Sequence, residues 1–103
     1  MTPIEKSLND YLTYLEIEKN RARKTRENYE RYLREFLKFS KAKSPKDITE
    51  DVVREFRLYL NRRNIKKITQ NYYVIALRNF LKYLLKRDIK VLAPEKIELP
   101  KIH

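Results

Sequence analysis

The chain contains no glycine, no cysteine and no tryptophan. Glycine supplies the tight turns of β-hairpins, so its absence argues against a β-rich fold. Without cysteine, neither a disulfide framework nor a thiolate metal site can form. No apolar run reaches the length of a membrane span, and the N-terminal residues MTPIEKSLND lack the apolar segment of a signal peptide. These absences predict a helical, cytoplasmic protein with no membrane partner.

Acidic residues are also scarce relative to basic ones. Asp and Glu total 14 against 25 Lys and Arg, which gives a net charge of +11. A domain this basic predicts a polyanionic partner, usually nucleic acid. The alternative is a charge-rich surface of the thermophile type, but such surfaces usually balance their signs. The length of 103 residues predicts a single domain.

Residues that carry catalysis are missing as well. The only histidine is His103, at the last position. There is no Gly-rich phosphate loop and no histidine-containing metal spacing. Glu16 and Glu18 stand two apart on an expected helix and point to different faces, so they form no carboxylate pair. The sequence therefore predicts no catalytic residue, no metal site and no cofactor.

The apolar residues that are present recur with helical spacing in four segments. The first segment is expected to begin with Thr2 as N-cap, Pro3 at the first position and Glu5 completing a capping box. The others are expected to begin at Thr25, Thr49 and Thr69, and the last to run to about residue 87. The fold expected is an all-α four-helix bundle made of two helical hairpins, over residues 1–88. Residues 89–103 are expected to form a linker or tail.

The second and fourth segments resemble each other. Residues 25–39 are TRENYERYLREFLKF and residues 69–83 are TQNYYVIALRNFLKY. Both begin with Thr, and both place apolar residues on one predicted inner face. Any two amphipathic helices share such apolar matches, but the shared Thr, Arg and Lys positions favour a repeated unit. The predicted inner residues are Tyr29, Leu33 and Phe36 in one copy and Tyr73, Leu77 and Phe80 in the other.

A group of cations precedes each copy. Lys19 to Arg26 is rich in Lys and Arg, and so is Arg62 to Lys67. In a bundle of two hairpins these two junctions can lie at one end, beside the N-termini of the second and fourth helices. Cations, helix N-termini and hydroxyl groups together suit phosphate oxygens. One such cluster alone would favour an ordinary solvated loop, but two clusters at equivalent positions favour binding. The candidate DNA-binding residues are Arg21, Arg23, Lys24, Thr25, Arg26, Lys66, Lys67, Thr69, Gln70, Asn71 and Arg78.

Helix 69–87 carries further polar residues on its predicted outer face. Gln70 and Asn71 could hydrogen-bond base edges, adenine especially, or could be plain polar residues of a first turn. Ile75 and Tyr72 are expected to be exposed there, which favours contact with a thymine methyl group or with a partner helix. A helical protein-interaction module is therefore the alternative function. An RNA-binding module lacks support because no stacking platform of exposed aromatics is predicted.

The ordered set of motifs resembles the N-terminal core-binding (SAM-like) domain of tyrosine recombinases, the phage-integrase and Xer-like family. The resemblance rests on four segments and covers almost the whole chain. These segments are YLTYLEIEKNRARKTRENYERYLREFLKF, DITEDVVREFRLYL, ITQNYYVIALRNFLKYLLKRD and the Pro-containing connector APEKIELPK.

The resemblance implies a DNA-binding domain that forms half of a clamp around double-stranded DNA, with its second and fourth helices facing the major groove. It also implies that the chemistry of DNA integration and recombination lies in a separate catalytic domain of the same parent chain. That domain would carry the Arg, Lys and His residues and the nucleophilic Tyr, so no tyrosine here is assigned as nucleophile. Other recombinase protomers on the DNA are further implied partners.

Overall fold

The computed structural model describes residues 1–99 and contains helices but no strand in this range. Pro100, Lys101 and His103, which belong to the expected tail, lie outside the described residues. Two short 3₁₀ helices, η1 (Pro45–Asp47) and η2 (Pro94–Lys96), accompany the α-helices. The all-α prediction is confirmed. The α-helices are α1 (Pro3–Ile17), α2 (Arg23–Ser40), α3 (Glu50–Arg62) and α4 (Lys67–Lys86).

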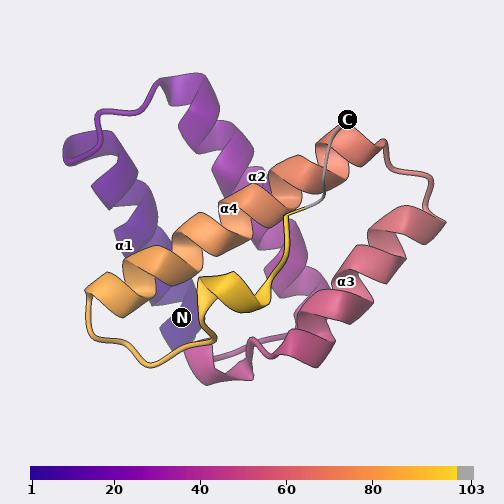
Figure 1. The fold of residues 1–103 in the computed structure, drawn as a ribbon. Coiled ribbons are helices and arrows are strands. Elements are labelled where there is room, and N and C mark those ends of the chain that lie inside the picture. Colours follow the sequence, from indigo (N-terminus) through magenta and orange to yellow (C-terminus); the bar gives the residue numbers. More distant parts are fainter. Residues whose placement is uncertain (100–103) are drawn as a thin grey trace.

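The four helices form two hairpins that cross. α1 pairs with α2, α3 pairs with α4, and the largest contact between helices joins α2 to α4. Figure 1 shows α4 running diagonally across the fold, so that it packs against α1, α2, α3 and η2. The two related segments of the sequence are therefore the two helices that cross at the centre.

One hydrophobic core fills the space between the helices. Leu33 and Phe36 of α2 and Leu77 and Phe80 of α4 are each at most 2% exposed, as their spacing predicts. Tyr29 departs from that prediction, because it is only half-buried, and Tyr32 beside it takes the buried position. The core is therefore built as expected from the apolar stripes, except that the buried tyrosine of α2 is Tyr32, three residues after Tyr29.

The helix starts follow the sequence in two cases and depart from it in two. Thr2 and Thr49 are N-caps whose hydroxyls accept from the amides of Glu5 and Val52. The expected starts at Thr25 and Thr69 are wrong, because α2 begins after Ala22 and α4 after Lys66, two residues earlier in each case. Both threonines therefore lie within the first turn, and neither of these helices has a side-chain cap.

Replacement of Thr25, Thr49 and Thr69 by Ala should distinguish a threonine that caps a helix from threonines that lie within the first turn. Thr49→Ala should lower the free energy of unfolding by about 1 kcal/mol, because the Val52 amide loses its 3.2 Å hydrogen bond. Thr25→Ala and Thr69→Ala should change it by about 0.5 kcal/mol or less. Thermal melts followed by circular dichroism would measure all three. Equal losses at Thr49 and Thr69 would contradict the cap assignment.

The helix ends manage without glycine. Positive φ angles, between 48° and 62°, occur at Asn20, Lys41, Asn64 and Asp88, and each of these residues directly follows or closely follows a helix. At the end of α2, the Lys41 amide donates to the Leu37 carbonyl at 2.9 Å. The left-handed position that glycine usually fills is thus taken by Asn, Asp and Lys.

The segment expected to be a linker packs on the bundle for part of its length. Pro94 is buried and Ile97 is only 2% exposed, and η2 packs directly against α4. The domain boundary at residue 88 stays a prediction, but residues up to Ile97 contribute to the core. No described helix is both long and apolar enough to cross a membrane.

Candidate nucleic-acid interface

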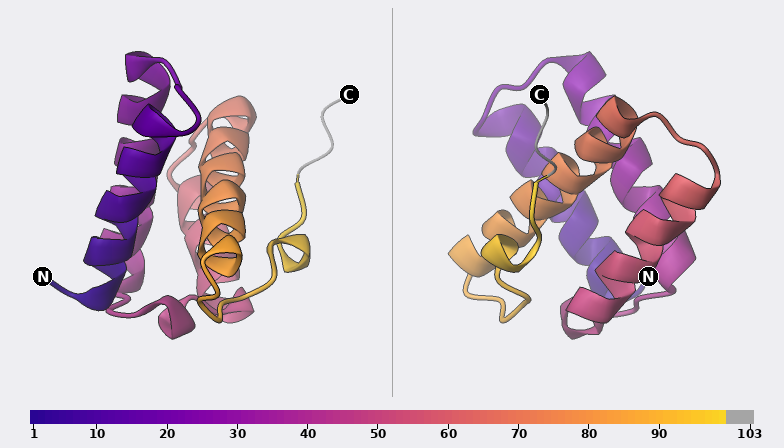
Figure 2. Two further views of the ribbon diagram at one scale, coloured as in Figure 1. Left: turned by 90° about the vertical axis from the view of Figure 1, so that its left-hand side faces the viewer. Right: turned by 45° about the vertical axis from the view of Figure 1, so that its right-hand side comes forward.

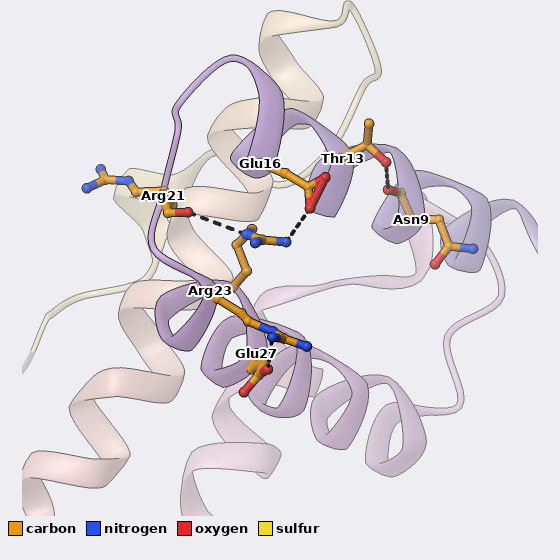
Figure 3. A network of polar contacts seen from close by, with 7 residues as sticks. Asn9, Thr13, Glu16, Arg21, Arg23 and Glu27 are labelled. Atoms are coloured by element: carbon orange, nitrogen blue, oxygen red, sulfur yellow. Dashed lines mark hydrogen bonds and ion pairs between the residues drawn. The ribbon is translucent and has the colours of Figure 1, made fainter.

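The connection between α1 and α2 carries the first basic cluster, which comprises Lys19, Arg21, Arg23, Lys24 and Arg26. All except Arg26 are exposed. The Arg26 guanidinium donates to the Arg21 carbonyl and forms an ion pair with Glu16 of α1, which closes the connection (Figure 3). Arg26 is therefore largely occupied inside the protein. The other four side chains remain at the surface.

The exposed members of this cluster differ in their partners. Arg23 forms an ion pair with Glu27, at 3.3 Å and one helical turn away. That pair is highly exposed, so it holds Arg23 only weakly. Lys19, Arg21 and Lys24 have no ion-pair partner among residues 1–99. Their charges are available to an external anion.

The connection between α3 and α4 carries the second cluster, formed by Arg62, Arg63, Lys66 and Lys67. All four side chains are exposed, and within the described range none forms an ion pair. Arg63 stacks over Tyr59 at 5.2 Å and donates to its hydroxyl, so its side chain is partly ordered. Arg62, Lys66 and Lys67 therefore have free charges, whereas the charge of Arg63 is partly fixed by Tyr59.

Both clusters lie on the same side of the molecule. In Figure 1 the α1–α2 and α3–α4 connections are on the upper side, and the α2–α3 connection and the end of α4 are on the lower side; the views of Figure 2 agree. The N-termini of α2 and α4 lie beside the clusters. Their free N–H groups add partial positive charge there. The two clusters therefore lie on a common side of the fold, as expected, but at its left and right corners in Figure 1.

Two of the predicted base-reading residues, Gln70 and Asn71, are less exposed than expected. Gln70 is half-buried, and its Nε2 donates to the Ile65 carbonyl at 2.6 Å, which fixes the turn into α4. Asn71 was expected on the outer face, and this is wrong, because its side chain is 8% exposed and its Oδ1 has no hydrogen-bond partner among the described residues. Contact of either residue with DNA stays a prediction.

The outer face of α4 is nevertheless mixed apolar and basic. Ile68 and Tyr72 are 44% and 46% exposed, whereas Ile75 and Arg78 are half-buried. The expectation of an exposed Tyr72 is confirmed, and Ile75 is less open than expected. An apolar strip beside cations suits either a DNA groove or a protein partner.

Two cations that the sequence analysis did not select extend the basic surface along α4. Lys82 and Lys86 are exposed and stand one helical turn apart on the same face. That spacing was visible in the sequence. The sequence does not show that these lysines lie beside the α1–α2 cluster, because that proximity arises only when the two hairpins cross.

Groups that could support catalysis through a metal are absent from the part of the chain described. Residues 1–99 contain no grouping of His, Cys, Asp or Glu that could hold a metal ion. The described residues form a basic, partly apolar surface made of two connections and one helix face. Such a surface offers positive charge to a polyanion.

Comparison with known proteins identifies the family to which the chain belongs. No curated protein and no solved structure gives a significant match to the chain. One family model does match, described as the phage integrase, N-terminal SAM-like domain, over residues 8–88. That range begins within α1, continues to the end of α4 and includes both basic clusters. Because the match covers most of the sequence and the fold is all-helical, the chain belongs to the family of phage integrase N-terminal SAM-like domains.

Proposed function

We propose that the chain is the core-binding domain of a site-specific tyrosine recombinase, and that it clamps double-stranded DNA for integration or recombination. The observation that carries this proposal is the placement of two basic clusters on one side, each beside the N-terminus of one of the crossing helices. Phosphate groups are recognised by Lys, Arg and free helix N–H groups. The family membership supports the same reading.

The proposal assigns positioning to this domain and chemistry to another. Strand cleavage and joining would be carried out by a catalytic domain of the same parent chain, in the cytoplasm, with other recombinase protomers on the same DNA. The phosphate contacts would come from Arg21, Arg23, Lys24, Lys66 and Lys67. Thr25, Thr69 and Arg78 lie close enough in sequence and fold to add contacts, and Arg26 acts chiefly by holding the α1–α2 connection in shape.

Titration of a fluorescently labelled duplex against salt concentration tests the proposal. With about five phosphate contacts, the logarithm of the binding constant should fall with the logarithm of salt concentration with a slope of about −4 to −5. The measurement is fluorescence anisotropy with the folded chain over 50–300 mM salt, a range of about sixfold chosen to keep binding measurable. An RNA duplex of the same sequence serves as the shape control.

The alternative function predicts a different result. The exposed side chains of Ile68 and Tyr72 could meet a partner helix, and a hydrophobic interface shows almost no dependence on salt. No binding to duplex DNA at 50 mM salt, or a slope near zero, would contradict the DNA-clamping role and favour the protein-interaction module.

A further inference from the structure

A pocket opens between α1, the α1–α2 connection, α2 and the second half of α4. Its cavity volume is about 310 Å³, at the low end of the range of small-ligand sites. Tyr11, Tyr14, Tyr29 and Tyr83 line it. We call it the tyrosine pocket. No sequence motif accounts for it, although Tyr29 belonged to a predicted inner face.

Cations also line the tyrosine pocket, and no acidic residue does. They are Lys19 and Arg21 from the α1–α2 connection and Lys82 and Lys86 from α4. None of the four has an ion-pair partner within residues 1–99. Like charges gathered around one cavity repel one another, and an anion inside it would offset that repulsion.

The lysines are held near the cavity by an aromatic ring. The Nζ atoms of Lys19 and Lys86 lie 6.0 and 5.7 Å from the centre of the Tyr14 ring. Cation–π contacts of this kind are weak at exposed sites but bias a flexible side chain towards the ring. Asp10 and Glu18, whose charges act on Tyr83, line a different hollow, which shares Tyr14 and Tyr83 with the tyrosine pocket.

Phenol groups add hydrogen-bond donors. Tyr29 Oη accepts from Asn79 Nδ2 at 3.3 Å, which leaves the phenolic hydrogen of Tyr29 free to donate into the pocket. Burial raises the pKa of Tyr11 and of Tyr83, so both phenols stay protonated at physiological pH. A set of cations and neutral O–H donors suits an oxyanion with several acceptor oxygens.

The pocket wall is already packed before any ligand binds. Tyr11 contacts Phe80 and Tyr83, with ring centres 5.3 and 5.2 Å apart, and Tyr14 contacts Tyr83 at 4.8 Å. Packed aromatic rings hold their positions, so little conformational entropy would be lost on binding. The wall therefore belongs to the core on one side and offers a fixed surface on the other.

We propose that the tyrosine pocket seats one phosphate group, and that in the complex this is a backbone phosphate of the bound duplex. The inference rests on the proposed DNA-binding function and deepens it. Lys19 and Arg21 belong both to this pocket and to the first basic cluster, so the pocket continues the proposed DNA surface. Lys82, Lys86 and the Tyr29 hydroxyl are the contacts that this adds.

Neutralisation of the two α4 lysines tests the pocket. Lys82→Gln with Lys86→Gln should weaken duplex binding about tenfold at 0.1 M salt and reduce the magnitude of the salt slope by about 1, the amount expected for one phosphate. The matched control is Lys43→Gln with Lys46→Gln in the α2–α3 connection, since neither residue lines the tyrosine pocket. This control carries the same net charge and should bind with the slope of the parent chain.

A second variant tests the hydroxyl without changing charge. Tyr29→Phe keeps the ring and removes only the Oη atom, so it should fold as the parent does while binding DNA several-fold more weakly, with the salt slope unchanged. Thermal melts of each variant establish that the fold is intact. If both the lysine and the tyrosine variants bind like the parent, the pocket is not a phosphate site.

Free phosphate separates the two sources of the ligand. Inorganic phosphate added to the chain at low salt, followed by ¹H–¹⁵N NMR, should shift the Asn79 side-chain amide and the amides near Tyr14, while chloride at equal ionic strength should not. Added duplex DNA should displace the inorganic phosphate from the pocket. Absence of these shifts with both phosphate and DNA would overturn the pocket. A parent chain that binds free phosphate here but no duplex would overturn the DNA source and the proposed function together.

The outcomes for pocket and function are thus distinct. If the lysine variant binds like the parent while charge reversal at Arg23 and Lys24 abolishes binding, the pocket proposal fails and the DNA-clamping proposal stands. If the lysine variant and its control in the α2–α3 connection lose affinity equally, net charge alone explains the loss, and the pocket proposal again fails.

Discussion

Leu77→Ala should lower the free energy of unfolding by about 2–5 kcal/mol. Leu77 is 2% exposed, on the face of α4 that packs into the core shared by all four helices. Truncation removes its buried methyl groups and leaves a cavity that close-packed neighbours fill only in part. A small domain is stable by only about 5–15 kcal/mol, so this loss is large. Urea unfolding followed by circular dichroism would measure it.

Leu85→Ala on the same helix is the matched control. Leu85 is 41% exposed, so the same chemical change should cost about 1 kcal/mol or less. Melting temperatures should separate the two variants by about 5 °C or more in a domain of this size. Similar losses at Leu77 and Leu85 would mean that the inner face of α4 is not where the structure places it.

Arg23→Glu combined with Lys24→Glu should weaken duplex binding by about 10- to 100-fold at 0.1 M salt, if each residue contacts one phosphate. Both side chains are exposed beside the N-terminus of α2, and the only described ion pair of either is the exposed Arg23–Glu27 pair. Phosphate contacts carry no sequence information. Two labelled duplexes of unrelated sequence should therefore lose affinity by the same factor.

The control for this variant reverses two charges elsewhere. Lys43→Glu with Lys46→Glu changes the net charge equally but lies in the α2–α3 connection, on the far side from both clusters. It should bind within a few-fold of the parent at 0.15 M salt, because charges beyond about 8 Å are screened. Parent-like affinity of the Arg23 and Lys24 variant at low salt would remove the α1–α2 connection from the interface.

The fold was largely predictable because helical spacing dominates this sequence. Leu33, Phe36, Leu77 and Phe80 recur with the helical period, and each is buried as expected. The starts of α2 and α4 were less predictable. A Thr N-cap contributes only about 1 kcal/mol. The hydrogen bonds by which Arg26 and Gln70 hold the two connections outweigh that contribution. Local capping preference yields where tertiary contacts fix the chain.

The charge of the candidate site was predictable from the sequence, but the positions of its individual side chains were less so. The two clusters are contiguous in sequence, so their exposure and common side followed from a two-hairpin fold. The prediction for Asn71 was wrong because its burial depends on which residues cover α4, and helical periodicity does not reveal that. Ile97 is buried for the same reason, as a single apolar residue without a periodic pattern. The tyrosine pocket needed three separate segments to meet, which no local pattern encodes.

Because the helix ends form without glycine, the stability of the fold can change separately from its DNA-binding surface. An L-residue with positive φ brings its Cβ close to a carbonyl oxygen, and Lys41 lacks the short polar side chain by which Asn and Asp offset this. Lys41 follows the C-terminal end of α2, on the side of the fold opposite to the basic clusters. The strain at Lys41 therefore lies where no contact with DNA is proposed. Selection or design could relax it and change the lifetime of the fold, leaving the recognition surface as it is.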